Sequence, residues 1–206
     1  MTKRKSRNKS LLIVFYRNPE LGKVKTRLAS SIGEAKAYSI YLLLCEHTRG
    51  VIEDLPVHKA LFYSDFIDTD DIWSNDVYQK HLQTDGDLGE KMDAAFRTGF
   101  NAGYTSICII GTDCLELTGK IVTEAFKKLL THDIVIGPAA DGGYYLLGMK
   151  HIHPALFKNK NWGSDAVLTQ TLDDIKQLGL TCWQMQALKD VDHIEDLPPN
   201  FQLDNQ

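Results

Sequence analysis

The sequence predicts an α/β protein, with a mostly parallel sheet of about seven strands and helices on both faces. Short, almost wholly apolar runs such as residues 107–110 are typical of strands that are buried on both faces. Longer segments carry apolar residues at helical spacing, most clearly residues 34–52. Because the two kinds of segment alternate along the chain, we expect a sheet that helices cover on both sides.

The composition is ordinary for a globular protein, with 206 residues, 43% hydrophobic, 24% charged and a formal net charge of -4. We expect a flexible basic arm at residues 1–10 and a single domain over residues 11–206. The net charge is negative, so the chain as a whole lacks the basic character that is typical of nucleic-acid binding. No apolar run is long enough for a signal peptide or a membrane span. Four cysteines without a C-x-x-C pair favour the cytoplasm and no structural zinc.

Strands are expected where apolar, β-branched or aromatic runs end at polar or Gly residues. These runs are residues 11–16, 59–64, 77–83, 107–110, 133–137, 144–149 and 180–188. Helices are expected at residues 34–52, after the turn at 84–89, at 118–131, and from a cap at Ser164 to residue 178. Residues 151–163 are interpreted as a flap or substrate-facing insertion. We interpret Asp65, Asp68, Asp70 and Asp71 as solvated surface acids, because they lack EF-hand spacing.

One acid follows the expected strand at residues 107–110. After Gly111 ends the apolar run, Asp113 comes two residues later. Ligands in open α/β sheets sit at the carboxyl ends of strands, so Asp113 is a metal or substrate candidate. An Asp here can instead cap the next helix, but Thr118 is the better cap and leaves Asp113 free. We expect Cys114 to serve in packing, since no His lies near it in the sequence.

The loop at residues 17–27 follows the first strand and is broken by Pro19 and Gly22. Its cations Lys23, Lys25 and Arg27 alternate at spacing two, which places them on one side of an extended segment. Such a loop suits a diphosphate or triphosphate, although a solvated basic loop is the plainer interpretation. It is not a Walker motif.

Two further segments combine acids with glycines. Residues 84–92 form a Gly-containing turn before a helix, which alone is a weak signal. Asp141, Gly142 and Gly143 are typical of a hairpin turn, but the acid can also serve a site in which the glycines leave room for substrate.

The chain ends with two more candidate ligands. Asp190 and Asp192 follow the last expected strand at spacing two, which suggests a metal ligand. Capping the final helical turn is the alternative role for Asp192. We rank His193 lower, because a hard cation prefers carboxylates, and whether Asp190 or His193 joins the site stays open.

Four motifs in this order resemble the GT-A (Rossmann-like) superfamily of nucleotide-diphosphosugar transferases. They are P-x-x-G-K-V-K-T-R-L at residues 19–28, G-D-L-G-E-K-M at 86–92, I-G-T-D-C at 110–114 and P-A-A-D-G-G-Y-Y-L-L-G at 138–148. The D-V-D-x-x-E-D-L ending at 190–197 matches too, so the resemblance runs from residue 11 to 197. More narrowly, the chain resembles a bacterial family of predicted glycosyltransferases of the arsenosugar-biosynthesis and radical-SAM-selenodomain-associated type.

The resemblance implies a role for each motif. Lys25 and Arg27 would bind phosphates, and Asp113 and Asp192 would hold Mg²⁺ or Mn²⁺. The nucleotide- or substrate-binding set that we predict is Arg17, Gly22, Gly86, Asp87, Leu88, Gly89, Gly142, Gly143, Tyr144 and Trp162. The chain departs from the family pattern at His193, where Thr is usual, at Leu115, where Pro is common, and at Gly163-Ser164, where a Ser/Thr pair is usual.

The function that follows is a metal-dependent transferase with a nucleotide sugar or nucleoside triphosphate as donor and a small-molecule acceptor. Lys25 and Arg27 would stabilise charge, and Asp141 would position or deprotonate an acceptor hydroxyl. The first loop lacks the L-x-G-G-x-S-x-R-M pattern of many nucleotidyltransferases, which favours glycosyl transfer. A nucleotidyltransferase that releases pyrophosphate, similar to cofactor guanylyltransferases, and a non-catalytic nucleotide-binding protein are the alternatives. The nucleobase, sugar, acceptor and oligomeric state stay open.

Overall fold

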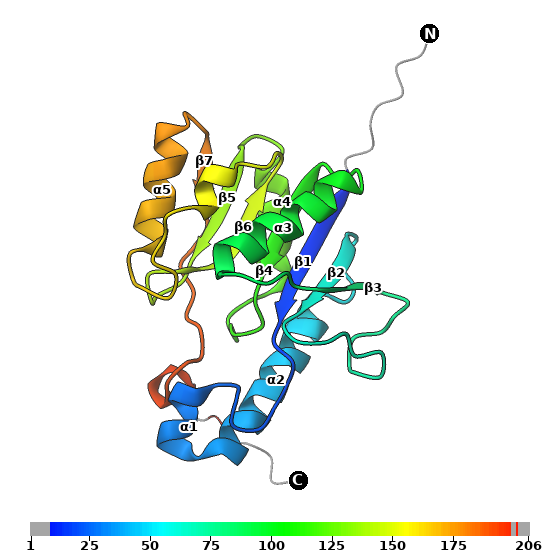
Figure 1. Ribbon diagram of the computed structural model, residues 1–206, viewed down its shortest axis with the longest axis vertical. Helices are drawn as coiled ribbons and strands as arrows, with labels where there is room; N and C mark the ends of the chain where they lie inside the picture. Colours follow the sequence, from blue (N-terminus) through cyan, green and yellow to red (C-terminus); the bar gives the residue numbers. More distant parts are fainter. Residues whose placement is uncertain (1–8, 199–200, 202–206) are drawn as a thin grey trace.

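The computed structural model describes residues 9–198 and 201, and it has a seven-stranded sheet at its centre (Figure 1). The strands are β1 Ser10–Tyr16, β2 His58–Tyr63, β3 Tyr78–Leu82, β4 Ser106–Ile110, β5 Ile134–Pro138, β6 Tyr144–Met149 and β7 Cys182–Gln184. Their order in the sheet is β3-β2-β1-β4-β6-β5-β7, and only β6 runs antiparallel to its neighbours. The predicted mostly parallel sheet is therefore confirmed.

Helices cover both faces of this sheet, as predicted (Figure 1). They are α1 Thr26–Ile32, α2 Glu34–Ile52, α3 Leu88–Asn101, α4 Gly119–Lys128 and α5 Val167–Gln177, with short 3-10 helices η1 Pro154–Phe157 and η2 Ile194–Asp196. Side chains alternate along a strand, so Leu12 of β1 shares a buried core with α2 and α4, while Ile13 shares the opposite core with α3. None of these helices has the length and apolar character that crossing a membrane requires.

Local signals explain where two of the helices begin. The Thr118 side chain accepts a hydrogen bond from the backbone N of Ile121, so it caps α4 as predicted and leaves Asp113 free of that role. Asp87 and Glu90 form a reciprocal capping box at the start of α3. All four cysteines are free.

Two predictions near the carboxyl terminus are wrong. Helix α5 begins at Val167 and not at Ser164, whose hydroxyl donates to the carbonyl of Asn161. The last strand is also much shorter than residues 180–188, since β7 pairs with β5 only over three residues. Beyond it, the backbone N of Met185 donates to the Ile136 carbonyl, and an isolated bridge joins Ala139 to Leu188.

A third, smaller core joins the first loop to the end of the chain. Leu28 of α1 packs with Ala37, Ile40 and Leu44 of α2 and with Val191. The predicted loop covered residues 17–27 and no helix was predicted before residue 34, so this contact was not foreseen. It matters because it fixes residues 25–27 beside residues 190–192.

The acidic segment between β2 and β3 is anchored by a buried ion pair. Lys80 Nζ lies 2.8 Å from Asp71 Oδ1, and the two side chains are only 6% and 9% exposed. Tyr63 donates to the other Asp71 oxygen at 2.6 Å, and the backbone N of Trp73 donates to Asp71 Oδ1 at 2.9 Å. The prediction that Asp71 is solvated is therefore wrong, whereas Asp65 and Asp70 are exposed as predicted.

Replacing Asp71 with Asn should destabilise the fold by about 3 kcal/mol, because Lys80 would stay buried without its counter-charge. Urea unfolding followed by tryptophan fluorescence measures this loss. The neighbouring exposed Asp70 provides the matched control, and Asp70→Asn should stay within about 0.5 kcal/mol of the wild type. An Asp71→Asn protein as stable as the Asp70→Asn protein would contradict the anchoring role of this ion pair.

Candidate functional site

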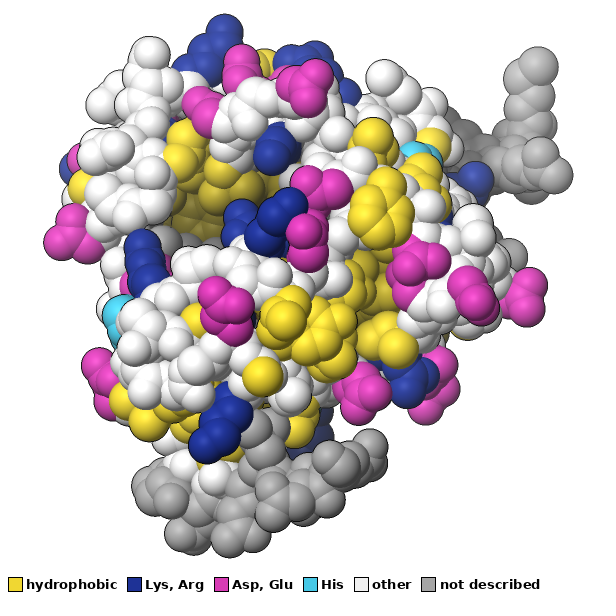
Figure 2. Space-filling model, turned by 60° about the horizontal axis from the view of Figure 1, so that its bottom comes forward, with side chains coloured by type: hydrophobic (Ala, Val, Ile, Leu, Met, Phe, Trp, Pro, Cys, Tyr) yellow, Lys and Arg dark blue, Asp and Glu magenta, His cyan; other side chains and the backbone are white. Residues whose placement is uncertain are grey.

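A cavity of about 640 Å³ opens at one edge of the sheet. It is lined by residues that follow the carboxyl ends of β1 and β4, by the start of α3, by the amino end of β6 and by the segment at residues 190–192. This is the edge where ligands bind in open α/β sheets, and the volume is in the range of small-molecule sites. Figure 2 shows a hollow with hydrophobic side chains in its depth and basic and acidic groups side by side near it.

One lysine joins the two predicted metal ligands. Lys25 Nζ lies 2.5 Å from Asp113 Oδ1 and 3.2 Å from Asp192 Oδ1, and its side chain is only 5% exposed. Arg27 approaches Asp192 from the solvent side, with Nη1 3.3 Å from Oδ2. Burial alone would lower the pKa of Lys25, but attraction to the two carboxylates outweighs it and raises that pKa above its ordinary value. Lys25 is therefore a fixed positive charge in the cavity.

The backbone accounts for the position of Lys25. This residue has φ 48° and ψ 45°, a left-handed conformation that is uncommon outside Gly, Asn and Asp, and it precedes the first residue of α1. The Asp113 carbonyl accepts a hydrogen bond from the backbone N of Val191, which ties the carboxyl-terminal segment to the end of β4. The loop is thus folded, and not extended as predicted.

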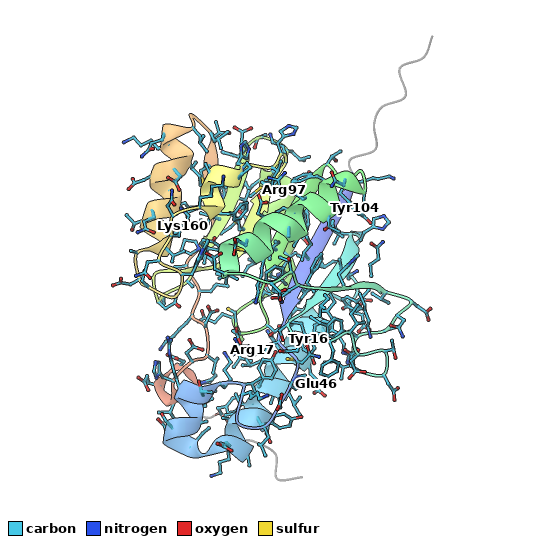
Figure 3. The ribbon with its side chains drawn as sticks, in the orientation of Figure 1. Tyr16, Arg17, Glu46, Arg97, Tyr104 and Lys160 are labelled. Carbon is cyan, nitrogen blue, oxygen red and sulfur yellow. The ribbon has the colours of Figure 1, made fainter. Side chains whose placement is uncertain are left out.

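Folding of this loop separates the three cations that were expected to share a side. Lys23 pairs with Glu20 at 2.8 Å and is 70% exposed, so it does not face the cavity. Arg17 does line the cavity, and its carbonyl accepts a hydrogen bond from the Tyr41 hydroxyl of α2. Figure 3 shows Arg17 just beyond the end of β1, beside α2. The expectation that Lys23 shares a side with Lys25 and Arg27 is therefore wrong, and the cations of this loop that line the cavity are Arg17, Lys25 and Arg27.

Two further carboxylates border the same cavity. Asp141 lies in the turn between β5 and β6, where its Oδ1 accepts from the backbone N of Gly143 at 2.9 Å. The hairpin interpretation is confirmed, and Asp141 also lines the cavity. Burial, followed by repulsion from Asp113 and Asp141, raises the pKa of Asp190 to about 7. Because burial and the neighbouring acids disfavour its charged form, Asp190 adds less negative charge to the cluster than Asp113 and Asp192 do.

The end of the chain does not use Asp192 as a helix cap. His193 occupies that position before η2, and its backbone N donates to Asp196 Oδ2. Asp192 is left to contact Lys25 and Arg27 through its side chain. Cys114 packs in the core that α2 and α4 share, as expected, although it also borders the cavity, and burial raises the pKa of its thiol to about 12.

Several predicted binding residues lie outside the cavity lining. Asp87 is engaged in capping α3, and a Cβ at Gly89 would overlap the Phe157 carbonyl oxygen and the Trp162 ring. Gly89 and Trp162 thus contact each other, and they hold residues 151–163 against α3. The same insertion is fastened to α5 by the buried side chain of Lys160, whose Nζ lies 2.5 Å from Asp174 Oδ2 (Figure 3). The insertion at residues 151–163 therefore packs against α3 and α5, and only Gly163 of it lines the cavity.

The glycines of the β5–β6 turn have a similar local role. Gly142 has φ +89°, and a Cβ there would overlap the backbone of Asp165. Its carbonyl also accepts from the backbone N of Leu168, so the turn supports the start of α5. The predicted residues that line the cavity are Arg17, Lys25, Arg27, Leu88, Asp113, Asp141, Tyr144 and Asp192. Those that do not are Gly22, Gly86, Asp87, Gly89, Gly142, Gly143 and Trp162.

Sequence reasoning missed some lining residues that have a recognisable signal. Ser64 and Gln83 line the cavity and directly follow β2 and β3, so the rule that singled out Asp113 would have found them. Lys91 and Met92 line it from the first turns of α3 and carry no such signal.

The acids at Lys25 have the chemistry of a Mg²⁺ or Mn²⁺ site. Two carboxylates that complete their shell with substrate phosphates and water are a common donor set for Mg²⁺. Asp113 and Asp192 fit this set, because both reach a single cationic atom. No group of three or more His, Cys, Asp or Glu side chains within the described residues forms a metal cage by itself. The remaining ligands would therefore have to come from substrate.

Comparison with solved structures supports the same fold. A protein of Desulfovibrio desulfuricans G20, provisionally described as a nucleotide-diphospho-sugar transferase, is 29% identical with a TM-score of 0.85, over 92% of this chain and 85% of that one. A cytidylyltransferase from Leptospira borgpetersenii serovar Hardjo-bovis is 12% identical with a TM-score of 0.61, over 92% and 84%. An inositol-1-phosphate CTP transferase from T. maritima is 13% identical with a TM-score of 0.52, over 94% and 93%. The last two likenesses show the fold alone.

The architecture is thus the α/β, Rossmann-like fold of nucleotide-diphospho-sugar transferase structures. A search of curated proteins found no match. A family model matches residues 49–164, which include α3, β4 with Asp113, and the turn with Asp141. Because this match spans more than half of the chain, the protein belongs to the family described as "Uncharacterized protein conserved in bacteria (DUF2064)".

Proposed function

We propose that this protein is a glycosyltransferase that uses a nucleotide-activated sugar and a divalent cation, Mg²⁺ or Mn²⁺. The observation that carries the proposal is the contact of Lys25 with both Asp113 and Asp192 at the edge of a ligand-sized cavity. Anionic and cationic side chains that converge in this way suit a metal-bound diphosphate, which presents both kinds of partner.

The cationic residues would bind the donor phosphates. Lys25 and Arg27 lie beside the proposed metal ligands, and Arg17 extends the positive charge toward the end of β1. Their charge-assisted hydrogen bonds would stabilise the nucleoside diphosphate as it leaves. A divalent cation bound by Asp113 and Asp192 would neutralise further negative charge on the phosphates.

Two observations favour glycosyl over nucleotidyl transfer. The Desulfovibrio relative, at 29% identity, is provisionally described as a nucleotide-diphospho-sugar transferase. The first loop also brings no glycine to the cavity, since Gly22 lies against Glu34 and is not among the lining residues. Phosphate binding here would therefore proceed without the glycine-rich turn of many nucleotidyltransferases. Nucleotidyl transfer with release of pyrophosphate stays the alternative, because the cytidylyltransferases share this fold.

The reaction exchanges one bond to the anomeric carbon for another. The bond from that carbon to the diphosphate oxygen breaks, a bond to the acceptor hydroxyl oxygen forms, and the nucleoside diphosphate leaves with the electron pair. Asp141 is held by Gly143 at the rim of the cavity and would orient the acceptor hydroxyl or accept its proton. Tyr144 donates to Met92 Sδ at 3.9 Å, and both residues line the cavity and would contact the acceptor.

The narrower assignments rest on the sequence. The chain resembles the arsenosugar-biosynthesis and radical-SAM-selenodomain-associated type of glycosyltransferase. On that resemblance we propose that the acceptor is a small molecule. Four unpaired thiols, three of them buried, agree with a cytoplasmic location, which we also propose.

Product analysis distinguishes the two transfer reactions. The protein is incubated with Mn²⁺, a panel of nucleotide sugars and candidate hydroxyl acceptors, and in parallel with nucleoside triphosphates and sugar phosphates. We expect release of a nucleoside diphosphate from the first mixture and no pyrophosphate from the second. Pyrophosphate release would instead establish nucleotidyl transfer, and binding without turnover of any donor would support a non-catalytic protein.

Replacing Asp113 with Ala should weaken Mn²⁺-dependent nucleotide binding at least about 100-fold, because one of only two protein carboxylates at the cation is lost. Calorimetry with the nucleotide that gives the largest Mn²⁺-dependent thermal shift measures this change. Asp173→Ala removes an exposed acid of α5 and should bind as the wild type does. Unchanged binding by the Asp113→Ala protein would rule out the proposed cation site.

A further inference from the structure

We propose that Lys25 acts as an internal cation that keeps Asp113 and Asp192 occupied until the phosphates of a donor draw its ammonium group away. Divalent-cation binding would then depend on the donor being present. This inference rests on the proposed function, since it assumes that the two acids are the cation ligands.

The first argument is position. Lys25 Nζ contacts an oxygen of each acid, at 2.5 Å and 3.2 Å, so the ammonium group already takes the bridging place between them. A divalent cation that both carboxylates coordinate would overlap the position of this ammonium group. Two positive charges a few ångströms apart repel strongly in a partly buried site. Lys25 must therefore move before both acids can coordinate the cation.

The second argument is that Lys25 is held in place and gains little by leaving alone. Its side chain is 5% exposed, and its backbone is fixed in a left-handed conformation at the start of α1. Helix α1 is in turn packed through Leu28 against α2 and Val191. Without another anion in the cavity, the ammonium group would lose two carboxylate partners and find only water.

The third argument is charge balance. In the structure, Lys25 and Arg27 together offset the negative charge of Asp113 and Asp192. A divalent cation alone would add positive charge to a nearly balanced group. A bound nucleoside diphosphate brings its own negative charge, which offers Lys25 new oxygen partners and frees the carboxylates. Bound nucleotide would therefore increase the affinity for the cation, and by thermodynamic linkage the bound cation would increase the affinity for the nucleotide by the same factor.

The experiment measures Mn²⁺ binding by calorimetry and by electron paramagnetic resonance, for the wild type and for Lys25→Gln. Each protein is titrated with Mn²⁺ alone and again in the presence of a nucleoside diphosphate (UDP, GDP, CDP or ADP in turn). We expect the wild type to bind Mn²⁺ alone between about tenfold and a hundredfold more weakly than Lys25→Gln, since two charged contacts compete with it. The nucleoside diphosphate should enhance Mn²⁺ binding much more in the wild type.

Two further variants serve as controls. Lys25→Arg keeps the positive charge and should bind Mn²⁺ alone as weakly as the wild type. Lys23→Gln removes the same charge from the same loop, at an exposed position paired with Glu20, and should also behave as the wild type. If Lys25→Gln does not fold, Lys25→Asn takes its place, because Asn tolerates the left-handed backbone better.

The outcomes separate this inference from the function on which it rests. If the wild type and Lys25→Gln bind Mn²⁺ alone with equal affinity, the role of Lys25 is overturned, while the proposed transferase stands. If Mn²⁺ binds to neither protein under any condition, the cation site itself is overturned, and the inference fails with it.

Discussion

The contact of Lys25 with Asp113 and Asp192 is the interaction on which the candidate site depends. It joins a loop after β1, the end of β4 and a carboxyl-terminal segment 167 residues away from Lys25. Two carboxylates brought this close repel each other unless a cation lies between them. The fold therefore places the acids together and supplies one positive charge to make that placement stable.

The surrounding structure is arranged so that this contact persists. The small core of Leu28, α2 and Val191 sets the distance between the first loop and residues 190–192, and the hydrogen bond from Val191 to Asp113 fixes their register. Strands β4 and β5 run in the same direction, because both are antiparallel to β6, which lies between them. The turn with Asp141 follows the carboxyl end of β5 and therefore lies at the same edge of the sheet as Asp113.

The sequence predicted the parts of the fold that depend on local apolar pattern. The buried strands, the long helix α2 and the Thr118 cap all carry strong short-range signals, and Asp113 was found from its place after β4. The failures involve contacts between distant segments. Lys25 in a left-handed conformation, Asp71 paired with Lys80 and the early end of β7 each depend on a partner that spacing does not reveal. The alternating cations of the first loop even suggested the wrong conformation.

The glycines show why a motif near a site need not touch the ligand. Gly89 allows α3 to approach Phe157 and Trp162, and Gly142 allows the β5–β6 turn to approach Asp165. In both places a larger residue would overlap the neighbouring segment, so the glycine requirement is explained by packing. Charged residues of the motifs do reach the cavity, among them Lys25, Asp113 and Asp141, but so do Leu88 and Tyr144. A motif residue therefore has to be assigned to packing or to the cavity from its contacts, because its residue type alone does not decide.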